Sequence, residues 1–233
     1  MRYYQNTLMS RFNQKEFNDF IIEHNVISFL KQPITLKSGR SSFFYVNWRN
    51  ISNNVYLIDQ LTDYIISFVE SLGLGPDCFY GVPEGATKLA IITQYKWAKK
   101  QSNYNMGSHA LSMGRGRKKE HGEEKDRYFL GIPKGNTIVI EDVTTTGSSL
   151  IATIDNLRKV KVNVISAIVI TDRMERRDDG KSIKQATYER GIPYYAMSNV
   201  IELFREIFER KEIEEGIIKN INAYFERYGI EKL

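Results

Sequence analysis

The sequence predicts an α/β fold, in which a mostly parallel, twisted sheet is flanked by helices. Short apolar segments alternate with segments of helical periodicity along most of the 233 residues. The expected strands lie at residues 78–82, 136–143, 162–171 and 192–197. The expected helices lie at residues 57–70, 87–99, 150–157, 182–190 and 199–210. Strands and helices that alternate in this way form parallel sheets covered on both faces, and a chain of this length is expected to form one domain.

The arrangement of apolar residues indicates both helices and strands. Leu57, Leu61 and Ile65 recur on one helical face, and Gly73 ends that pattern. The two strands at 136–143 and 162–171 are apolar almost throughout, as is typical of strands buried on both faces. A further short strand is expected at 109–113, and a charged, glycine-punctuated loop at 114–127.

The last 30 residues carry an apolar stripe at helical spacing. Its members are Ile217, Ile218, Ile221, Tyr224, Phe225 and Tyr228. We expect this helix to pack on the body of the protein, and contact with a partner subunit is the alternative.

Composition excludes several classes of protein. The single cysteine, Cys78, rules out an internal disulfide framework or a multi-cysteine metal site, and its apolar neighbours indicate a buried side chain. No apolar run is long enough to cross a bilayer, and the N-terminus lacks the apolar stretch of a secretory signal, so we expect a cytoplasmic protein. The net charge of +5 suits phosphate-bearing ligands and is too small to indicate nucleic acid by itself.

The segment at 139–149 carries the strongest chemical signal. A buried strand ends in Glu141 and Asp142, five hydroxyl residues and one glycine follow, and a helix then begins. Small side chains let backbone N–H groups surround a phosphate, and the helix N-terminus adds partial positive charge. The two carboxylates can accept hydrogen bonds from sugar hydroxyls or hold the water shell of Mg²⁺. A capped turn explains one or two of the hydroxyls, and a P-loop is excluded because no lysine follows the glycine.

This segment resembles the phosphoribosyl pyrophosphate (PRPP) signature of type I phosphoribosyltransferases. The resemblance implies that the loop holds the 5-phosphate and that the acidic pair contacts the ribose. The implied PRPP-binding residues are Glu141, Asp142, Val143, Thr144, Thr145, Thr146, Gly147, Ser148 and Ser149.

Three further segments, in the same order along the chain, are similar to motifs of orotate phosphoribosyltransferases. They are TLKSGR at 35–40 with FFYVN at 43–47, RGRKKEHG at 115–122, and ITDRME at 170–175. The resemblance implies a type I phosphoribosyltransferase fold in one domain. That domain would consist of a small N-terminal hood at 1–55, a core at 56–210 and a C-terminal helix at 211–233.

The segment at 115–127 holds six Lys or Arg, four Asp or Glu and one His. An ordinary solvated loop would have the same composition, but glycines on both sides of 117–121 also suit a hinged lid. The resemblance makes it a lid whose cations bind the diphosphate, partly in the neighbouring subunit of a homodimer. The PRPP contacts that it implies outside the phosphate loop are Lys37, Arg115, Lys118, Lys119 and His121, and the implied catalytic residues are Lys119, His121 and Asp142.

The resemblance also implies an orotate site. It assigns Tyr45, Val46, Thr145 and Arg173 to the pyrimidine. Tyr45 and Val46 also suit a core strand. Arg173 lies at the end of an apolar strand, where α/β proteins place ligand-binding residues, and an ion pair with Asp172 or Glu175 is the alternative.

Two positions depart from the family's usual pattern. Glu84 and Gly85 stand where a Tyr-Lys pair is common, with Lys88 one helical turn later. Gly116 follows Arg115 where a lysine is common, and Arg117 or Lys118 could supply the charge. Both departures fall on the diphosphate contacts.

Together these features predict transfer of phosphoribosyl from PRPP to orotate, with Mg²⁺ held mainly by PRPP and water. We expect no membrane partner and no nucleic acid. Two alternatives remain open: a phosphoribosyltransferase for another base, and a non-enzymatic regulator that senses nucleotides and binds nucleic acid.

Overall fold

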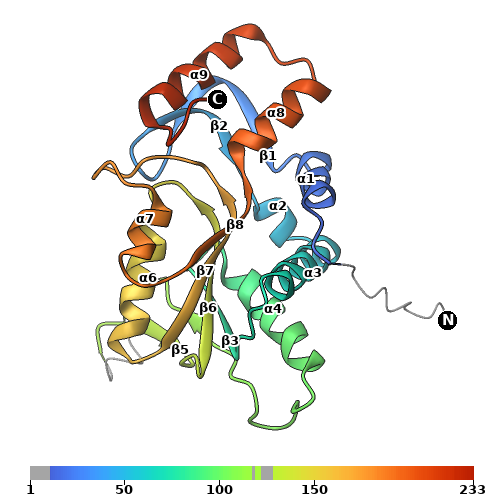
Figure 1. The fold of residues 1–233 in the computed structure, drawn as a ribbon, viewed down its shortest axis with the longest axis vertical. Helices are drawn as coiled ribbons and strands as arrows, with labels where there is room; N and C mark the ends of the chain where they lie inside the picture. Colours follow the sequence, from blue (N-terminus) through green and yellow to red (C-terminus); the bar gives the residue numbers. More distant parts are fainter. Residues whose placement is uncertain (1–10, 117–118, 122–127) are drawn as a thin grey trace, which may run out of the picture.

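A parallel sheet of four strands forms the centre of the protein (Figure 1). The computed structural model describes residues 11–116, 119–121 and 128–233. The sheet has the order β3-β6-β7-β8, and its neighbouring strands are parallel. Its strands are β3 (Cys78–Gly81), β6 (Asn136–Thr144), β7 (Asn163–Asp172) and β8 (Tyr194–Asn199). The two most apolar segments of the sequence, β6 and β7, are therefore the inner strands, as their composition predicts.

Helices cover both faces of this sheet, as predicted. Ile138, Ile140 and Ile168 point into one apolar cluster, together with α1 (Gln14–Glu23), α3 (Val55–Ser71), α4 (Thr87–Lys100) and α8 (Val200–Arg210). Val139 and Val169 point into a second cluster with α6 (Ser148–Lys159) and α7 (Ile183–Tyr188). Successive strand residues thus alternate between the two cores.

A smaller unit, called the hood below, lies at the carboxyl end of the sheet. An antiparallel hairpin of β1 (Ile27–Thr35) and β2 (Ser41–Val46) is followed by the short helix α2 (Arg49–Ser52). The C-terminal helix α9 (Glu215–Tyr228) packs beside this hairpin (Figure 1). Ile221, Tyr224 and Phe225 of its stripe are buried, which confirms the predicted packing on the body of the protein.

Local signals fix where the helices begin. Asn54 Oδ1 accepts hydrogen bonds from the backbone N–H groups of Tyr56 and Leu57, so α3 is capped at its start. Gly147 precedes α6 with a φ of +68°, a left-handed conformation that favours glycine.

The expected strand at 109–113 is wrong. Only Met113–Gly114 forms a strand, β4, which pairs with β5 (Phe129–Leu130). The carbonyl of Ala110 instead accepts a hydrogen bond from the Gln94 side chain at 2.9 Å. Cys78 is buried, as predicted, and its Sγ lies 3.3 Å from Ser112 Oγ. Within the described ranges no helix is long and apolar enough to cross a membrane.

Candidate active site

A cavity of about 860 Å³ opens where β6 and β7 end and the hood begins. Ligands of open parallel sheets bind at this edge. Three segments that are far apart in the sequence meet there: the loop after β6, the hairpin β1–β2 with α2, and the turn between β3 and α4. The lining of the cavity includes Lys37, Tyr45, Val46, Arg49, Glu84, Lys88, Glu141, Asp142 and Arg173, with residues 145–149.

The loop at 144–149 is held from several sides. Thr144 Oγ1 and the Tyr194 hydroxyl lie 2.8 Å apart, and that hydroxyl donates to Asp172 at 2.9 Å. The Arg177 guanidinium donates to the carbonyl of Thr146 at 2.5 Å. The loop therefore has a fixed path, and its N–H groups and hydroxyls are placed at the cavity before any ligand arrives. Arg177 was missed by the sequence analysis, because nothing in its local sequence indicates a contact with a loop 31 residues away.

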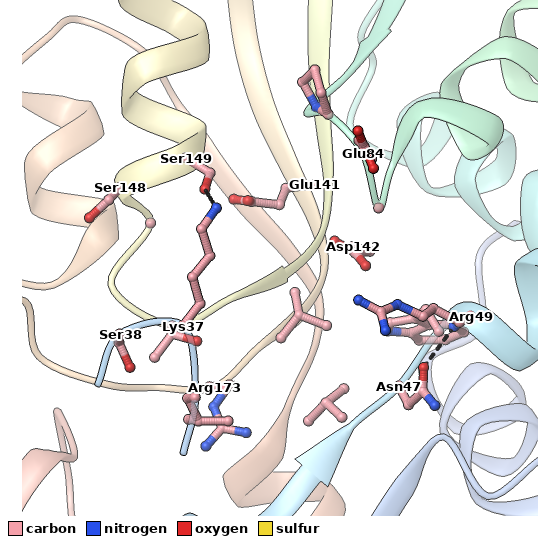
Figure 2. Close-up of a pocket in the computed structure, with 18 of the residues that line it drawn as sticks. Lys37, Ser38, Asn47, Arg49, Glu84, Glu141, Asp142, Ser148, Ser149 and Arg173 are labelled. Carbon is pink, nitrogen blue, oxygen red and sulfur yellow. Dashed lines mark hydrogen bonds between the residues drawn. The ribbon is translucent and has the colours of Figure 1, made fainter. Parts of the chain in front are cut away.

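The acidic pair lies in the middle of the cavity (Figure 2). Glu141 is 7% exposed, and its Oε2 has no hydrogen-bond partner among the described residues. Burial and, secondly, the nearby charge of Asp142 raise the pKa of Glu141 to about 8, while Lys37 acts in the opposite direction. Burial also raises the pKa of Asp142, against the effect of Arg49. An uncompensated buried carboxyl of this kind marks a place where a ligand hydroxyl or a metal-bound water can bind.

Lys37 connects the hood to the loop at 144–149. Its Nζ donates to Ser149 Oγ at 3.3 Å, across 112 residues of sequence (Figure 2). Tyr45 and Val46 line the same cavity from β2. The structure thus brings these predicted residues together with the loop and the acidic pair.

Arg173 lies at the predicted end of β7 and is 2% exposed. Its Nε pairs with Glu175 at 2.7 Å, its Nη2 donates to Ser42 and Tyr224, and its guanidinium stacks on Phe44. The structure therefore contains the ion pair with Glu175 that was the alternative for this residue. Arg173 also lines the cavity, and its Nη1 makes no hydrogen bond within the part of the chain that is described.

The predicted lid is described only in part. Lys118 lies outside the described residues. Lys119 and His121 are exposed, and of the residues described at 115–121, Gly116 lines the cavity. The backbone N–H of Arg115 donates to the carbonyl of Tyr128 at 2.8 Å.

The glycines of both departures lie close to acidic side chains. A Cβ at Gly85 would lie 2.6 Å from Asp142 Oδ1, so a side chain at 85 would displace that carboxylate. A Cβ at Gly116 would lie 2.9 Å from the Glu84 carboxyl carbon. The cavity cation Arg49 was not assigned a role by the sequence analysis, although the motif at 43–47 ends two residues before it. A second cavity cation, Lys88, was named there only as the lysine one helical turn after Glu84 and Gly85.

Known proteins are similar to this chain in sequence over most of its length. No family model matches the chain. The orotate phosphoribosyltransferase of Buchnera aphidicola subsp. Acyrthosiphon pisum is 29% identical over 226 residues, which cover 93% of this chain and 99% of that protein. The orotate phosphoribosyltransferase of Marinobacter nauticus is 27% identical over 219 residues, with coverage of 93% and 98%.

Solved structures agree on the fold. The orotate phosphoribosyltransferase of Francisella tularensis has a TM-score of 0.65 at 22% identity and covers 92% of this chain and 99% of its own. The UMP synthase of Leishmania donovani has a TM-score of 0.69 at 19% identity, and the match covers 91% of this chain and 42% of that one.

The chain therefore has the type I phosphoribosyltransferase fold, with the hydroxyl loop and the acidic pair at the carboxyl end of β6. Its sequence is similar to those of orotate phosphoribosyltransferases, which confirms the resemblance predicted from the motifs.

Proposed function

We propose that this protein transfers the phosphoribosyl group of PRPP to orotate, giving orotidine 5′-monophosphate and pyrophosphate in pyrimidine synthesis. One observation carries the proposal. The hydroxyl loop at 144–149, the acidic pair, Lys37 and the β2 residues Tyr45 and Val46 surround a single cavity.

In this proposal the phosphate loop binds the 5-phosphate and the acidic pair accepts hydrogen bonds from the ribose hydroxyls. N1 of orotate then forms a bond to the anomeric carbon, while the bond from that carbon to the diphosphate breaks. The transition state resembles an oxocarbenium ion, and negative charge moves onto the leaving diphosphate. The work of the protein is to hold two anions in line and to stabilise that charge.

The site is suited to bind Mg²⁺ together with PRPP. The described residues contain no group of three His, Cys, Asp or Glu side chains able to hold a metal. The partnerless Oε2 of Glu141 and the neighbouring Asp142 are instead suited to accept hydrogen bonds from metal-bound waters. When bound with PRPP, the ion would neutralise charge on the diphosphate.

Orotate would bind on the hood side. Tyr45 and Val46 would contact the ring from β2, Thr145 from the loop, and the unoccupied Nη1 of Arg173 could donate to a pyrimidine oxygen. Lys119, His121, Arg115 and Lys118 would act on the diphosphate from the lid, with Lys119, His121 and Asp142 as the catalytic residues.

We further propose a cytoplasmic homodimer in which the lid of one subunit serves the other. Val55 and Tyr56 are 85% and 71% exposed, and they lie two and three residues after Asn53, which lines the cavity. Apolar side chains exposed beside a site suit a subunit interface.

A screen of free bases with PRPP and Mg²⁺ tests the substrate. Turnover of orotate alone supports the proposal, whereas turnover of a purine would contradict it. Retention on nucleic acid at ~0.2 M salt without turnover of any base would favour the regulator.

A further inference from the structure

The cavity is arranged in three consecutive parts (Figure 2). The phosphate loop with Ser148 and Ser149 forms one side, and Glu141 and Asp142 occupy the middle. The far side is formed by α2 and the turn before α4. In the proposed complex the ribose lies on the acidic pair and its 5-phosphate lies in the loop. The anomeric carbon then faces the far side of the cavity, because it is at the opposite end of the sugar from the carbon that carries the 5-phosphate.

Arg49 is placed to bind an anion there. The residue is exposed, and its guanidinium has no hydrogen-bond or ion-pair partner within residues 11–116, 119–121 and 128–233. Its side chain extends from α2 toward Asp142 (Figure 2), and its charge acts on the pKa of that carboxyl. Five N–H donors therefore remain available at the cavity.

The backbone of Arg49 is fixed although its side chain is unpaired. Asn47 Oδ1 accepts a hydrogen bond from the Arg49 backbone N–H at 3.0 Å. The neighbouring Trp48 is buried and donates to Thr171 at 3.1 Å. The cation is thus presented from a rigid base, which reduces the entropy lost when it binds a ligand.

Lys88 lies against the end of the same helix, α2. Its Nζ donates to Asn53 Oδ1 at 2.6 Å and to the carbonyl of Ser52 at 3.4 Å. An ammonium group has three donors, so one remains for a ligand. Both residues that it contacts line the cavity at the end of α2.

Glu84, Gly85 and Lys37 do not supply a cation for an anion at the far side. Glu84 is negative, and Gly85 has no room for a side chain beside Asp142. Lys37 is bonded to Ser149 on the phosphate side.

We infer that Arg49, supported by Lys88, binds the diphosphate of PRPP and stabilises the charge that develops on it. This inference rests on the proposed function, since it takes PRPP as the ligand. It assigns the diphosphate to cations of the same subunit, in addition to those of the lid.

The test separates the two ends of PRPP by using inorganic pyrophosphate with Mg²⁺ and ribose 5-phosphate as separate probes in calorimetric titrations. Arg49→Ala should weaken pyrophosphate binding about ten- to a hundredfold, the loss expected for charge-assisted hydrogen bonds. It should change ribose 5-phosphate binding less than about twofold. Arg49→Lys should recover part of the loss, because it keeps the charge without the planar set of donors. Lys88→Ala should have a smaller effect in the same direction.

Arg205→Ala is the matched control. Arg205 is an exposed arginine on α8 and does not line the cavity, so this variant removes the same charge elsewhere. Any of three results would overturn the inference. They are equal effects of Arg49→Ala and Arg205→Ala, an equal loss of affinity for both probes, or no pyrophosphate binding by the unmodified protein. If the unmodified protein binds pyrophosphate through Arg49 but does not turn over orotate, the substrate assignment fails while the role of Arg49 stands.

Discussion

Burial of Glu141 makes the stability of the protein depend on pH. The folded state raises the pKa of this carboxyl from 4.5 to about 8, so it disfavours the charged form. Its contribution to stability is therefore complete below about pH 4.5 and is lost as the pH rises through about 8. We expect Glu141→Gln to melt at a higher temperature than the unmodified protein at pH 8, and at a similar temperature near pH 4.5. Melting curves of the two proteins that shift in parallel with pH would contradict this.

Arg173 has a structural role in addition to any contact with the pyrimidine. Glu175 is fully buried and is shared between Arg173 at 2.7 Å and Arg40 at 2.8 Å. Removing one partner of a buried pair leaves charge poorly compensated, so Arg173→Met should lower the free energy of unfolding by about 3 kcal/mol. The double variant Arg173→Met with Glu175→Gln should regain much of that loss in urea denaturation. A double variant no more stable than the single one would show that the pair carries little of the stability.

The sequence identifies the types of residue at the site well, but it identifies their contact partners poorly. The acidic pair and the hydroxyl loop could be predicted because they are continuous in the sequence. The contact of Lys37 with Ser149 and the bridge from Arg40 to Glu175 span 112 and 135 residues, and no local pattern indicates them. Arg49 lacked a predicted role for the same reason, since its position opposite Asp142 depends on how the hood folds over the sheet.

The start of α6 depends on a glycine that has two separate constraints. Gly147 has a φ of +68°, and a Cβ there would lie 2.6 Å from Ile183 Cγ1. Gly180 has a φ of +79° with nothing within 4 Å, so it is a matched control for backbone strain alone. Gly180→Ala should cost about 1 kcal/mol, and Gly147→Ala clearly more, because the buried Ile183 side chain must also move. Equal losses in urea denaturation would contradict the role given to Ile183.

Strands and helices of the core could be predicted from periodicity, whereas α1 and the hairpin β1–β2 could not. In β1 only Ile27 is fully buried, and Lys31, Gln32 and Pro33 interrupt any alternation. This hairpin is stabilised by packing against α8 and α9 from the other end of the chain, as in the contact of Phe44 with Phe204 and Phe225. Tertiary contacts therefore decide its structure, rather than local preference.

For the whole molecule, the proposed dimer predicts complementation between two inactive chains. Lys119→Ala removes a lid cation, and Asp142→Asn alters the acidic pair of the cavity. If each lid serves the partner's cavity, a mixed dimer has one intact site, and equal mixtures should regain roughly a quarter of the full activity. Activity is measured after subunit exchange has been verified by native mass spectrometry. Recovery near zero in verified mixed dimers, or full activity in a monomer, would contradict the shared lid.

In the proposed reaction, this cavity joins orotate to the ribose of PRPP. The most direct test of this reaction follows the ultraviolet absorbance of orotate after addition of PRPP, Mg²⁺ and the protein, with the products separated by chromatography. The proposal predicts that orotate disappears while orotidine 5′-monophosphate and pyrophosphate form in equal amounts, and that Asp142→Asn greatly slows this without lowering the melting temperature. Unchanged orotate in the presence of folded protein, PRPP and Mg²⁺ would contradict it.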